Sequence, residues 1–150
     1  MIHISNPYKW LFPVLGLAML LIYIDWASGI RAILIGGMGA SIADGINARF
    51  IKPNTDRIRP GKQYAEIRSL GSMNQGRKSF PSNHASNTMS FTLGIGLIFP
   101  WSFYILVPLS ILVGYSRIYC GAHYPLDVLF GWVHGMFWVS IIFELSRILF

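Results

Sequence analysis

The sequence contains five apolar runs, each close to the length of a bilayer-spanning helix, and this pattern restricts the fold more than any other feature. They cover about 10–24, 28–51, 82–99, 101–119 and 125–150, and a helix needs roughly 20 apolar residues to cross the hydrocarbon layer. The chain is 53% hydrophobic and only 12% charged, whereas soluble domains carry about 25% charged residues. The sequence therefore predicts an all-α fold, an integral membrane helical bundle of about five transmembrane helices in a single domain, 1–150.

The helix boundaries follow from proline positions. Lys52 precedes Pro53, and a residue before proline is disfavoured in helical geometry, so the second run should end there. Pro125 suits the first turn of the last helix. Between these helices lies a polar segment, which we expect to form an active-site loop over about 52–83. We expect the first apolar run to remain as a helix, because it lacks a clear signal-peptide cleavage site.

Counting five crossings brings the polar stretches together. The end of the second run, the start of the third, the end of the fourth and the start of the fifth would share one membrane face. Ten of the twelve basic residues, all but Arg31 and Arg147, would lie on that face. The net charge of +6 is thus concentrated in one region between apolar runs, which favours an anionic lipid headgroup or phosphate as partner over nucleic acid.

Three separated stretches carry side chains suited to phosphate chemistry. They are 52–60, with Lys52 and Arg59; 81–84, at the start of a helix; and 116–127, with Arg117. Arginine binds phosphate through a planar fork and lysine acts as a point charge. Backbone N–H groups at a helix start also attract anions. The candidate phosphate-binding residues are Lys52, Arg59, Ser82, Asn83 and Arg117.

The spacing of His123 and Asp127 indicates an activated nucleophile. Four residues separate them, about one helical turn, so the carboxylate can hold one ring nitrogen and leave the other free to attack phosphorus. His84 is then the natural general acid for the leaving alcohol. We expect neither a metal nor a cofactor, because fixed cations replace them.

The three stretches resemble the type 2 phosphatidic acid phosphatase (PAP2) superfamily, whose pattern is K-x6-RP, PSGH and SR-x5-H-x3-D. Asn83 stands where that family usually has glycine. The resemblance implies a phosphohistidine at His123, oriented by Asp127, with His84 as acid. It also implies a bacterial inner-membrane enzyme with its active site on the extracytoplasmic face, although the basic loop alone would predict a cytoplasmic face.

Other polar residues are interpreted as structural. The remaining loop cations are expected to form a solvated membrane-surface loop: Arg57, Lys62, Arg68, Arg77 and Lys78. Asp44 and Asn47 are expected to make interhelical hydrogen bonds, and His134 is expected to have a structural role. The glycines at 36, 37, 39, 131 and 135 predict close helix packing.

The predicted function is hydrolysis of a phosphomonoester or diphosphate of a membrane lipid by a metal-independent phosphatase. Phosphatidic acid, phosphatidylglycerol phosphate, a polyprenyl diphosphate and lipid A all remain open as substrates. A lipid phosphotransferase using the same intermediate is one alternative. A non-catalytic protein that binds anionic lipid is another, although it would not need His84, His123 and Asp127 together. The physiological lipid, the oligomeric state and the role of the 60–80 loop stay open.

Overall fold

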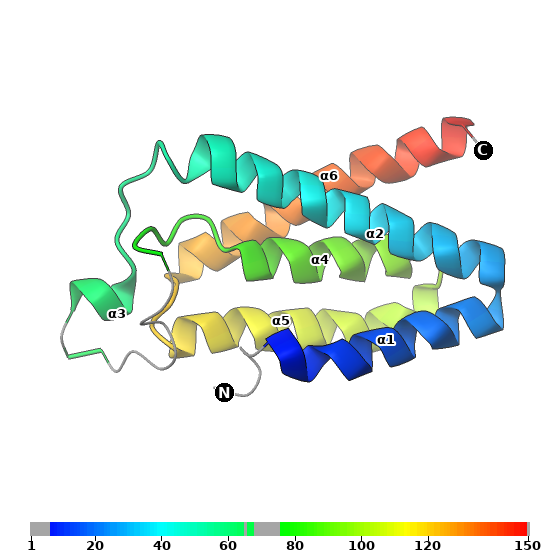
Figure 1. The fold of residues 1–150 in the computed structure, drawn as a ribbon, viewed down its shortest axis with the longest axis horizontal. Helices are drawn as coiled ribbons and strands as arrows, with labels where there is room; N and C mark the ends of the chain where they lie inside the picture. Colours follow the sequence, from blue (N-terminus) through cyan, green and yellow to red (C-terminus); the bar gives the residue numbers. More distant parts are fainter. Residues whose placement is uncertain (1–6, 65, 68–75, 150) are drawn as a thin grey trace.

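The protein is an elongated bundle of helices (Figure 1). The computed structural model describes residues 7–64, 66, 67 and 76–149, with side chains described from residue 12 to residue 148. The helices are α1 (Pro7–Ile24), α2 (Trp26–Ile46), η2 (Asn47–Ile51), α3 (Pro60–Gln63), α4 (Asn83–Gly96), η3 (Pro100–Ser102), α5 (Phe103–Tyr119) and α6 (Pro125–Leu149). The all-α prediction is confirmed. The short helix α3, within the polar segment, was not predicted.

Local sequence accounts for where the helices begin. The carboxylate of Asp25 accepts hydrogen bonds from the backbone N–H groups of Ala27 and Ser28, both at 3.1 Å, and so caps α2. The Ser82 hydroxyl caps α4 by accepting from the N–H of Ala85 at 3.4 Å. The second apolar run ends near Lys52 as predicted, but its last turn, η2, is π-helical.

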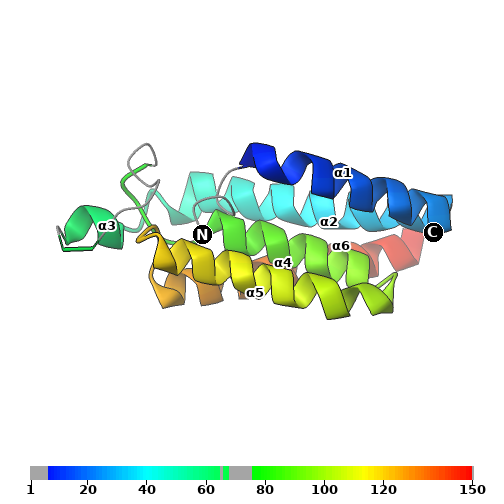
Figure 2. The same ribbon diagram turned by 90° about the horizontal axis from the view of Figure 1, so that it is seen from below.

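The helix α4 lies at the centre of the bundle, packed against α2, α5 and α6 (Figure 2). Glycines permit the close approach of α6. A Cβ atom at Gly131 would lie 2.6 Å from the carbonyl oxygen of Ser82, and one at Gly135 would collide with the carbonyl oxygen of Ser86. A Cβ atom at Gly39 of α2 would collide with the side chain of Val139 of α6. The predicted packing role is confirmed for these three glycines and for Gly36, which lies against Phe91, but it is wrong for Gly37, where a Cβ atom would meet open space.

Three helical stretches are long and apolar enough to cross a membrane among the residues that the structure describes: Trp26–Ile51, Pro100–Tyr119 and Pro125–Ile148. The stretch Phe12–Ile24 is apolar but shorter. The helix α4 has 14 residues, or about 21 Å, and it carries several hydroxyl and amide side chains. The chain is thus an integral membrane protein by its apolar helices, with three candidate spans rather than the five predicted.

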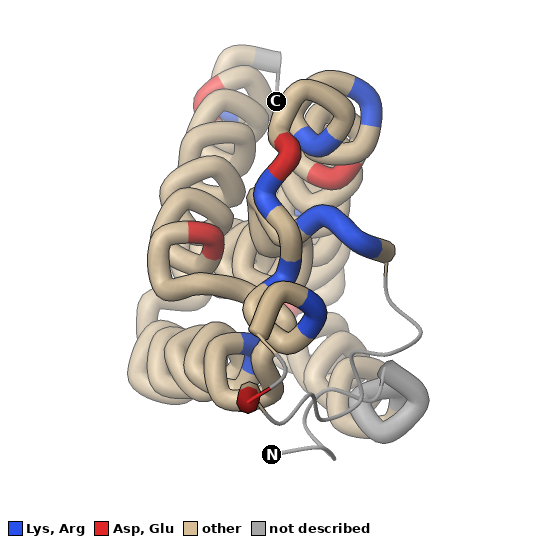
Figure 3. The backbone as a smooth tube through the Cα atoms, turned by 90° about the vertical axis from the view of Figure 1, so that its left-hand side faces the viewer, with Lys and Arg blue, Asp and Glu red and all other residues tan. Residues whose placement is uncertain are grey.

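The predicted convergence of the polar stretches is confirmed. The end of α2, the start of α4, the end of α5 and the start of α6 lie at the same end of the bundle as α3 (Figures 1 and 2). Viewed from that end, lysine and arginine residues gather on the end of α2 and on the segment that connects it to α4 (Figure 3). The candidate site residues all belong to this end.

Candidate active site

A short two-stranded ladder fixes the loop that follows α2. Ile58 forms an antiparallel bridge with Lys78. The N–H of Arg59 donates to the carbonyl of Arg77 at 3.2 Å, and the N–H of buried Ser79 donates to the carbonyl of Arg57 at 2.8 Å. In such extended backbone, residues two apart point to the same side. Arg57 and Arg59 therefore both reach toward the turn between α5 and α6.

The buried ring of His123 lies against Arg59. His123 is 2% exposed, and Nη1 of Arg59 lies 3.2 Å from its Nε2. A guanidinium is only a donor, so Nε2 must accept and the neutral ring carries its proton on Nδ1. Burial lowers the pKa of His123, with Arg59 and Arg117 acting the same way against the opposing effect of Asp127. The ring therefore stays neutral, with a lone pair on Nε2.

The carboxylate of Asp127 is fully buried, and groups of Tyr124, Arg57 and His123 lie against it. Its Oδ2 accepts from the N–H of Tyr124 at 2.9 Å, and its Oδ1 accepts from Nη1 of Arg57 at 2.9 Å. Its Oδ2 also lies 3.7 Å from Nδ1 of His123, which is longer than a hydrogen bond and amounts to a charge–dipole contact. The start of α6 contributes favourable helix-dipole potential to this acid.

Two cations, Arg59 and Arg117, lie near His123, and a third, Lys52, lies near Arg59. Arg59 is 6% exposed and donates through Nε to the carbonyl of Gly76 at 2.7 Å and through Nη1 to that of Ala122 at 2.9 Å. Arg117 is 1% exposed and lies close enough to lower the pKa of Arg59, after the larger effect of burial. Burial first, and then Arg59, lowers the pKa of Lys52. Packed cations that disfavour one another's charge are suited to binding an anion, which would offset their repulsion.

The start of α4 closes the other side of the site. The N–H of Ser82 donates to the carbonyl of Asp127 at 3.0 Å, which ties α4 to α6. The Ser82 hydroxyl accepts as a cap, so its proton remains available for a phosphate oxygen. Asn83 Oδ1 accepts from Nδ2 of buried Asn47 at 3.4 Å. The asparagine that departs from the family glycine is thus engaged with η2.

His84, in the first turn of α4, lies within electrostatic range of the same cations. Burial, followed by Arg117, His123, Arg59 and Lys52, lowers its pKa from 6.5 to about 3. Its ring is also open to an apolar groove. Without a bound anion, His84 is neutral and has no acidic proton to give.

Anion binding should therefore charge His84. A phosphate placed among Arg59, Arg117 and Lys52 offsets the cations that lower the pKa, so the pKa rises and the ring takes up a proton. At about pH 6, near the ordinary histidine value, we expect orthophosphate to shift the His84 ring signals toward the imidazolium form in NMR spectra. The assignment comes from His84→Asn. A His84 that titrates equally with and without orthophosphate would contradict this expectation.

The sequence missed one site residue. The sequence predicts a solvated loop position for Arg57, but the structure pairs its guanidinium with Asp127. Its position two residues before Arg59 could have indicated this, because residues two apart in extended backbone point to the same side. Asp44 and Asn47 make the interhelical bonds that were predicted: Asn87 Nδ2 donates to Asp44 Oδ2 at 3.0 Å, and Asn47 to Asn83. His134 accepts from Trp138 Nε1 at 2.8 Å, which confirms its structural role. Arg68 lies outside the described residues.

The arrangement matches a known family. The sequence profile of the PAP2 superfamily matches residues 30–148, most of the chain and all of the candidate site. This chain belongs to the PAP2 superfamily. The resemblance carried by its three motifs is thereby confirmed.

Several curated PAP2-type proteins are similar in sequence. A lipid A 4'-phosphatase of Porphyromonas gingivalis is 29% identical over 85% of this chain and 58% of its own length. The lipid A 4'-phosphatase of Bacteroides thetaiotaomicron is 28% identical over 81% of this chain and 56% of its own. An undecaprenyl-diphosphatase of Sulfolobus acidocaldarius is 38% identical over 43% of this chain and 31% of its own.

The chain spans between about a third and three-fifths of the length of these relatives. No solved structure matches significantly. Across the residues that the structure describes, no three histidine, cysteine, aspartate or glutamate side chains are grouped as they would be to hold a metal ion.

Proposed function

We propose that this protein is a membrane lipid phosphatase that releases inorganic phosphate through a phosphohistidine at His123. The observation that carries the proposal is the His123 ring itself: Arg59 lies 3.2 Å from Nε2, and Asp127 faces Nδ1. That pair of contacts places the lone pair on the nitrogen that faces the cations. Membership in the PAP2 superfamily supports the same chemistry.

The reaction proceeds in two displacements. Nε2 of His123 attacks phosphorus, the bond from phosphorus to the lipid oxygen breaks, and that oxygen takes the proton that His84 acquired when the anion bound. Neutral His84 then removes a proton from water, whose oxygen attacks phosphorus. The P–N bond breaks, and inorganic phosphate leaves with His123 restored. Lys52, Arg59, Arg117 and the start of α4 bind the phosphate oxygens whose charge must be stabilised.

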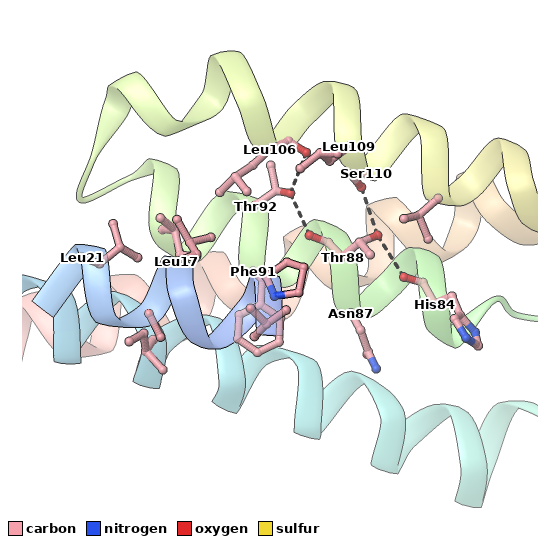
Figure 4. Close-up of a pocket in the computed structure, with 16 residues that line it drawn as sticks. Leu17, Leu21, His84, Asn87, Thr88, Phe91, Thr92, Leu106, Leu109 and Ser110 are labelled. Carbon is pink, nitrogen blue, oxygen red and sulfur yellow. Dashed lines mark hydrogen bonds between the residues drawn. The ribbon is translucent and has the colours of Figure 1, made fainter. Parts of the chain in front are cut away.

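An apolar groove beside His84 supports a lipid as the substrate. The groove has a volume of about 340 Å³ and lies between α1, α2, α4 and α5. His84 lies at one end and Leu21 at the other (Figure 4). The few hydroxyls on its wall are already paired: Thr88 Oγ1 lies 3.1 Å from Ser110 Oγ, and Thr92 Oγ1 donates to the carbonyl of Thr88 at 2.8 Å. What the wall offers a ligand is therefore apolar.

The length of the groove fits one leaflet. Along α4 it runs from His84 to Ile95, eleven residues or about 16 Å at 1.5 Å per residue. Half of a hydrocarbon core is about 15 Å. A lipid whose phosphate binds at the cationic end can therefore place one chain along the groove without leaving its leaflet. Two relatives are named lipid A 4'-phosphatases and one an undecaprenyl-diphosphatase, and both substrate types carry such chains.

The test is phosphate release by the detergent-purified protein from a panel of lipids with EDTA present throughout. The panel holds phosphatidic acid, phosphatidylglycerol phosphate, a polyprenyl diphosphate and lipid A. Release in EDTA supports a metal-independent hydrolase. Loss of lipid phosphate without free phosphate, when a lipid alcohol is added, would identify a phosphotransferase instead. No turnover of any lipid under either condition would contradict the proposal.

Narrowing the groove should separate lipids from soluble esters. Leu109 lines the groove, and Leu109→Trp is expected to raise KM for long-chain phosphatidic acid about tenfold, equivalent to about 1.4 kcal/mol. Hydrolysis of p-nitrophenyl phosphate should change less than about twofold. Ile111→Trp, on an exposed position of α5 outside the groove, is the matched control. Equal losses on both substrates would show that the groove does not hold the lipid.

We also propose that the basic end of the bundle faces the extracytoplasmic side of a bacterial inner membrane. Several of its cations are accounted for by phosphate binding, which makes them poor markers under the positive-inside rule. A reporter active only outside the cytoplasm, fused before Met1, should be active if α1 and α2 both cross the bilayer, because the basic end of the bundle follows α2. Activity of a cytoplasmic reporter at that position would reverse the orientation.

A further inference from the structure

Arg57 makes contacts that a solvated surface cation would not make. Its Nη1 donates to Oδ1 of Asp127 at 2.9 Å, and the carboxylate it meets is fully buried. The Arg57 side chain is 36% exposed. Its guanidinium also lies over the ring of Tyr124, with Cζ 4.3 Å from the ring centroid, a cation–π geometry.

The backbone fixes Arg57 in this place. Its carbonyl accepts from both the N–H of Ser79, at 2.8 Å, and the Ser79 hydroxyl, at 3.2 Å. Tyr124 is held in turn, because its hydroxyl donates to Oε1 of Gln63 in α3 at 2.7 Å. Hydrogen bonds therefore fix both the backbone of Arg57 and the ring of Tyr124, so the guanidinium is in place before a substrate binds.

The two oxygens of Asp127 have different partners. Arg57 occupies Oδ1, whereas Oδ2 accepts from the N–H of Tyr124 at 2.9 Å and faces Nδ1 of His123 at 3.7 Å. A buried carboxylate with a free Oδ1 would turn or recruit water to satisfy it. With Oδ1 occupied, the plane of the carboxylate is set and Oδ2 stays directed at the histidine.

We propose that Arg57 is a positioning residue that orients Asp127 and, through it, the Nδ1–H tautomer of His123, an inference that rests on the proposed phosphohistidine function. Arg57 acts from the side of the ring opposite to the phosphate, whereas Arg59, two residues along the same strand, meets the reactive Nε2. The two arginines of this extended segment thus have different roles. Arg57 orients Asp127, and Arg59 contacts His123 and the phosphate.

The test uses the full-length, detergent-purified protein with dioctanoyl phosphatidic acid as substrate and orthophosphate as inhibitor. Arg57→Met should lower kcat about 10- to 100-fold, the usual effect of removing a group that orients a reacting side chain. KM and inhibition by orthophosphate should change less than about threefold, because Arg57 does not face the phosphate. Arg57→Lys should recover part of kcat, since it keeps the charge but lacks the planar fork.

Arg77→Met is the matched control, because it removes the same charge from an exposed side chain of the partner strand; its kcat should equal that of the wild type. An Arg57→Met variant with wild-type kcat would overturn the proposal. Simultaneous loss of kcat, orthophosphate inhibition and thermal stability would also overturn it, because a purely structural role would then suffice.

A second measurement does not depend on turnover. In protein labelled with ¹⁵N-histidine, the His123 signals should show the Nδ1–H tautomer in the wild type and a smaller population of it in Arg57→Met. If the wild type hydrolyses no lipid but this change occurs, the proposed function fails and the role of Arg57 stands. Identical tautomer populations in the two proteins would remove that role even in an active enzyme.

Discussion

Replacement of His123 by alanine is expected to reduce phosphate release at least about 10³-fold, as removal of a catalytic nucleophile does in other enzymes. The physical reason is that, among the site residues that the structure describes, no other nitrogen keeps a free lone pair for phosphorus once the bound anion has charged His84. Arg59 and Arg117 are permanently charged, and His84 is needed to carry the proton. The measurement is kcat on the most active panel lipid, with orthophosphate inhibition as a check that the cationic site is intact.

His134→Ala supplies the comparison for this substitution. His134 lies in α6 and bonds to Trp138 of the same helix, so its loss should leave kcat within about threefold of the wild type. Comparable losses at both positions would mean that histidine removal damages the fold. A His123→Ala variant that still turns over lipid at a tenth of the wild-type rate or faster would exclude His123 as the nucleophile.

Asp127→Asn is expected to lower kcat about 10²- to 10⁴-fold, as in hydrolytic triads that lose the acid behind their histidine. The amide has nearly the same shape, but its nitrogen cannot accept from Nδ1–H of His123. Such an amide can turn to stabilise the other tautomer, whose proton lies on Nε2 and blocks attack. It also leaves Arg57 without its charge partner. The readout is kcat together with the ¹⁵N-histidine tautomer signals.

The same substitution at Asp56 is the control. Asp56 lies in the same loop, is 99% exposed and pairs with Lys78 at 3.2 Å. A surface ion pair of this kind contributes little, so Asp56→Asn should leave kcat unchanged. If Asp127→Asn kept more than half of the wild-type kcat, the carboxylate would have no part in orienting the histidine.

The end-on convergence of the site was predictable because it depends on chain direction rather than on packing detail. Helices that alternate in direction along the chain return every second connection to the same end, which brings 52–60, 81–84 and 116–127 together. The His123–Asp127 spacing was informative for a related reason. Pro125 begins α6, and Asp127 then lies in its first turn, from which its carboxylate reaches back past Tyr124.

The span count and Arg57 were not predictable from the same patterns. Hydropathy counts apolar residues, but α4 lies among three helices that shield its hydroxyl and amide groups, so it can be short and polar inside an apolar bundle. Arg57 was interpreted as a solvated cation because its partner lies 70 residues away. Arg57 is directed toward Asp127 by the Ile58–Lys78 bridge, and this pairing has no local sequence signal.

The phosphohistidine is the central claim, and its direct test is to trap it. The purified protein is mixed with lipid carrying a ³²P-labelled phosphate, quenched within milliseconds in base, where a phosphoramidate survives, and mapped by proteolysis and mass spectrometry. We expect label on His123 that disappears after brief acid treatment, and no label in His123→Ala. Rapid phosphate release by the wild type with no labelled His123 at any quench time, or label on another residue, would contradict the mechanism.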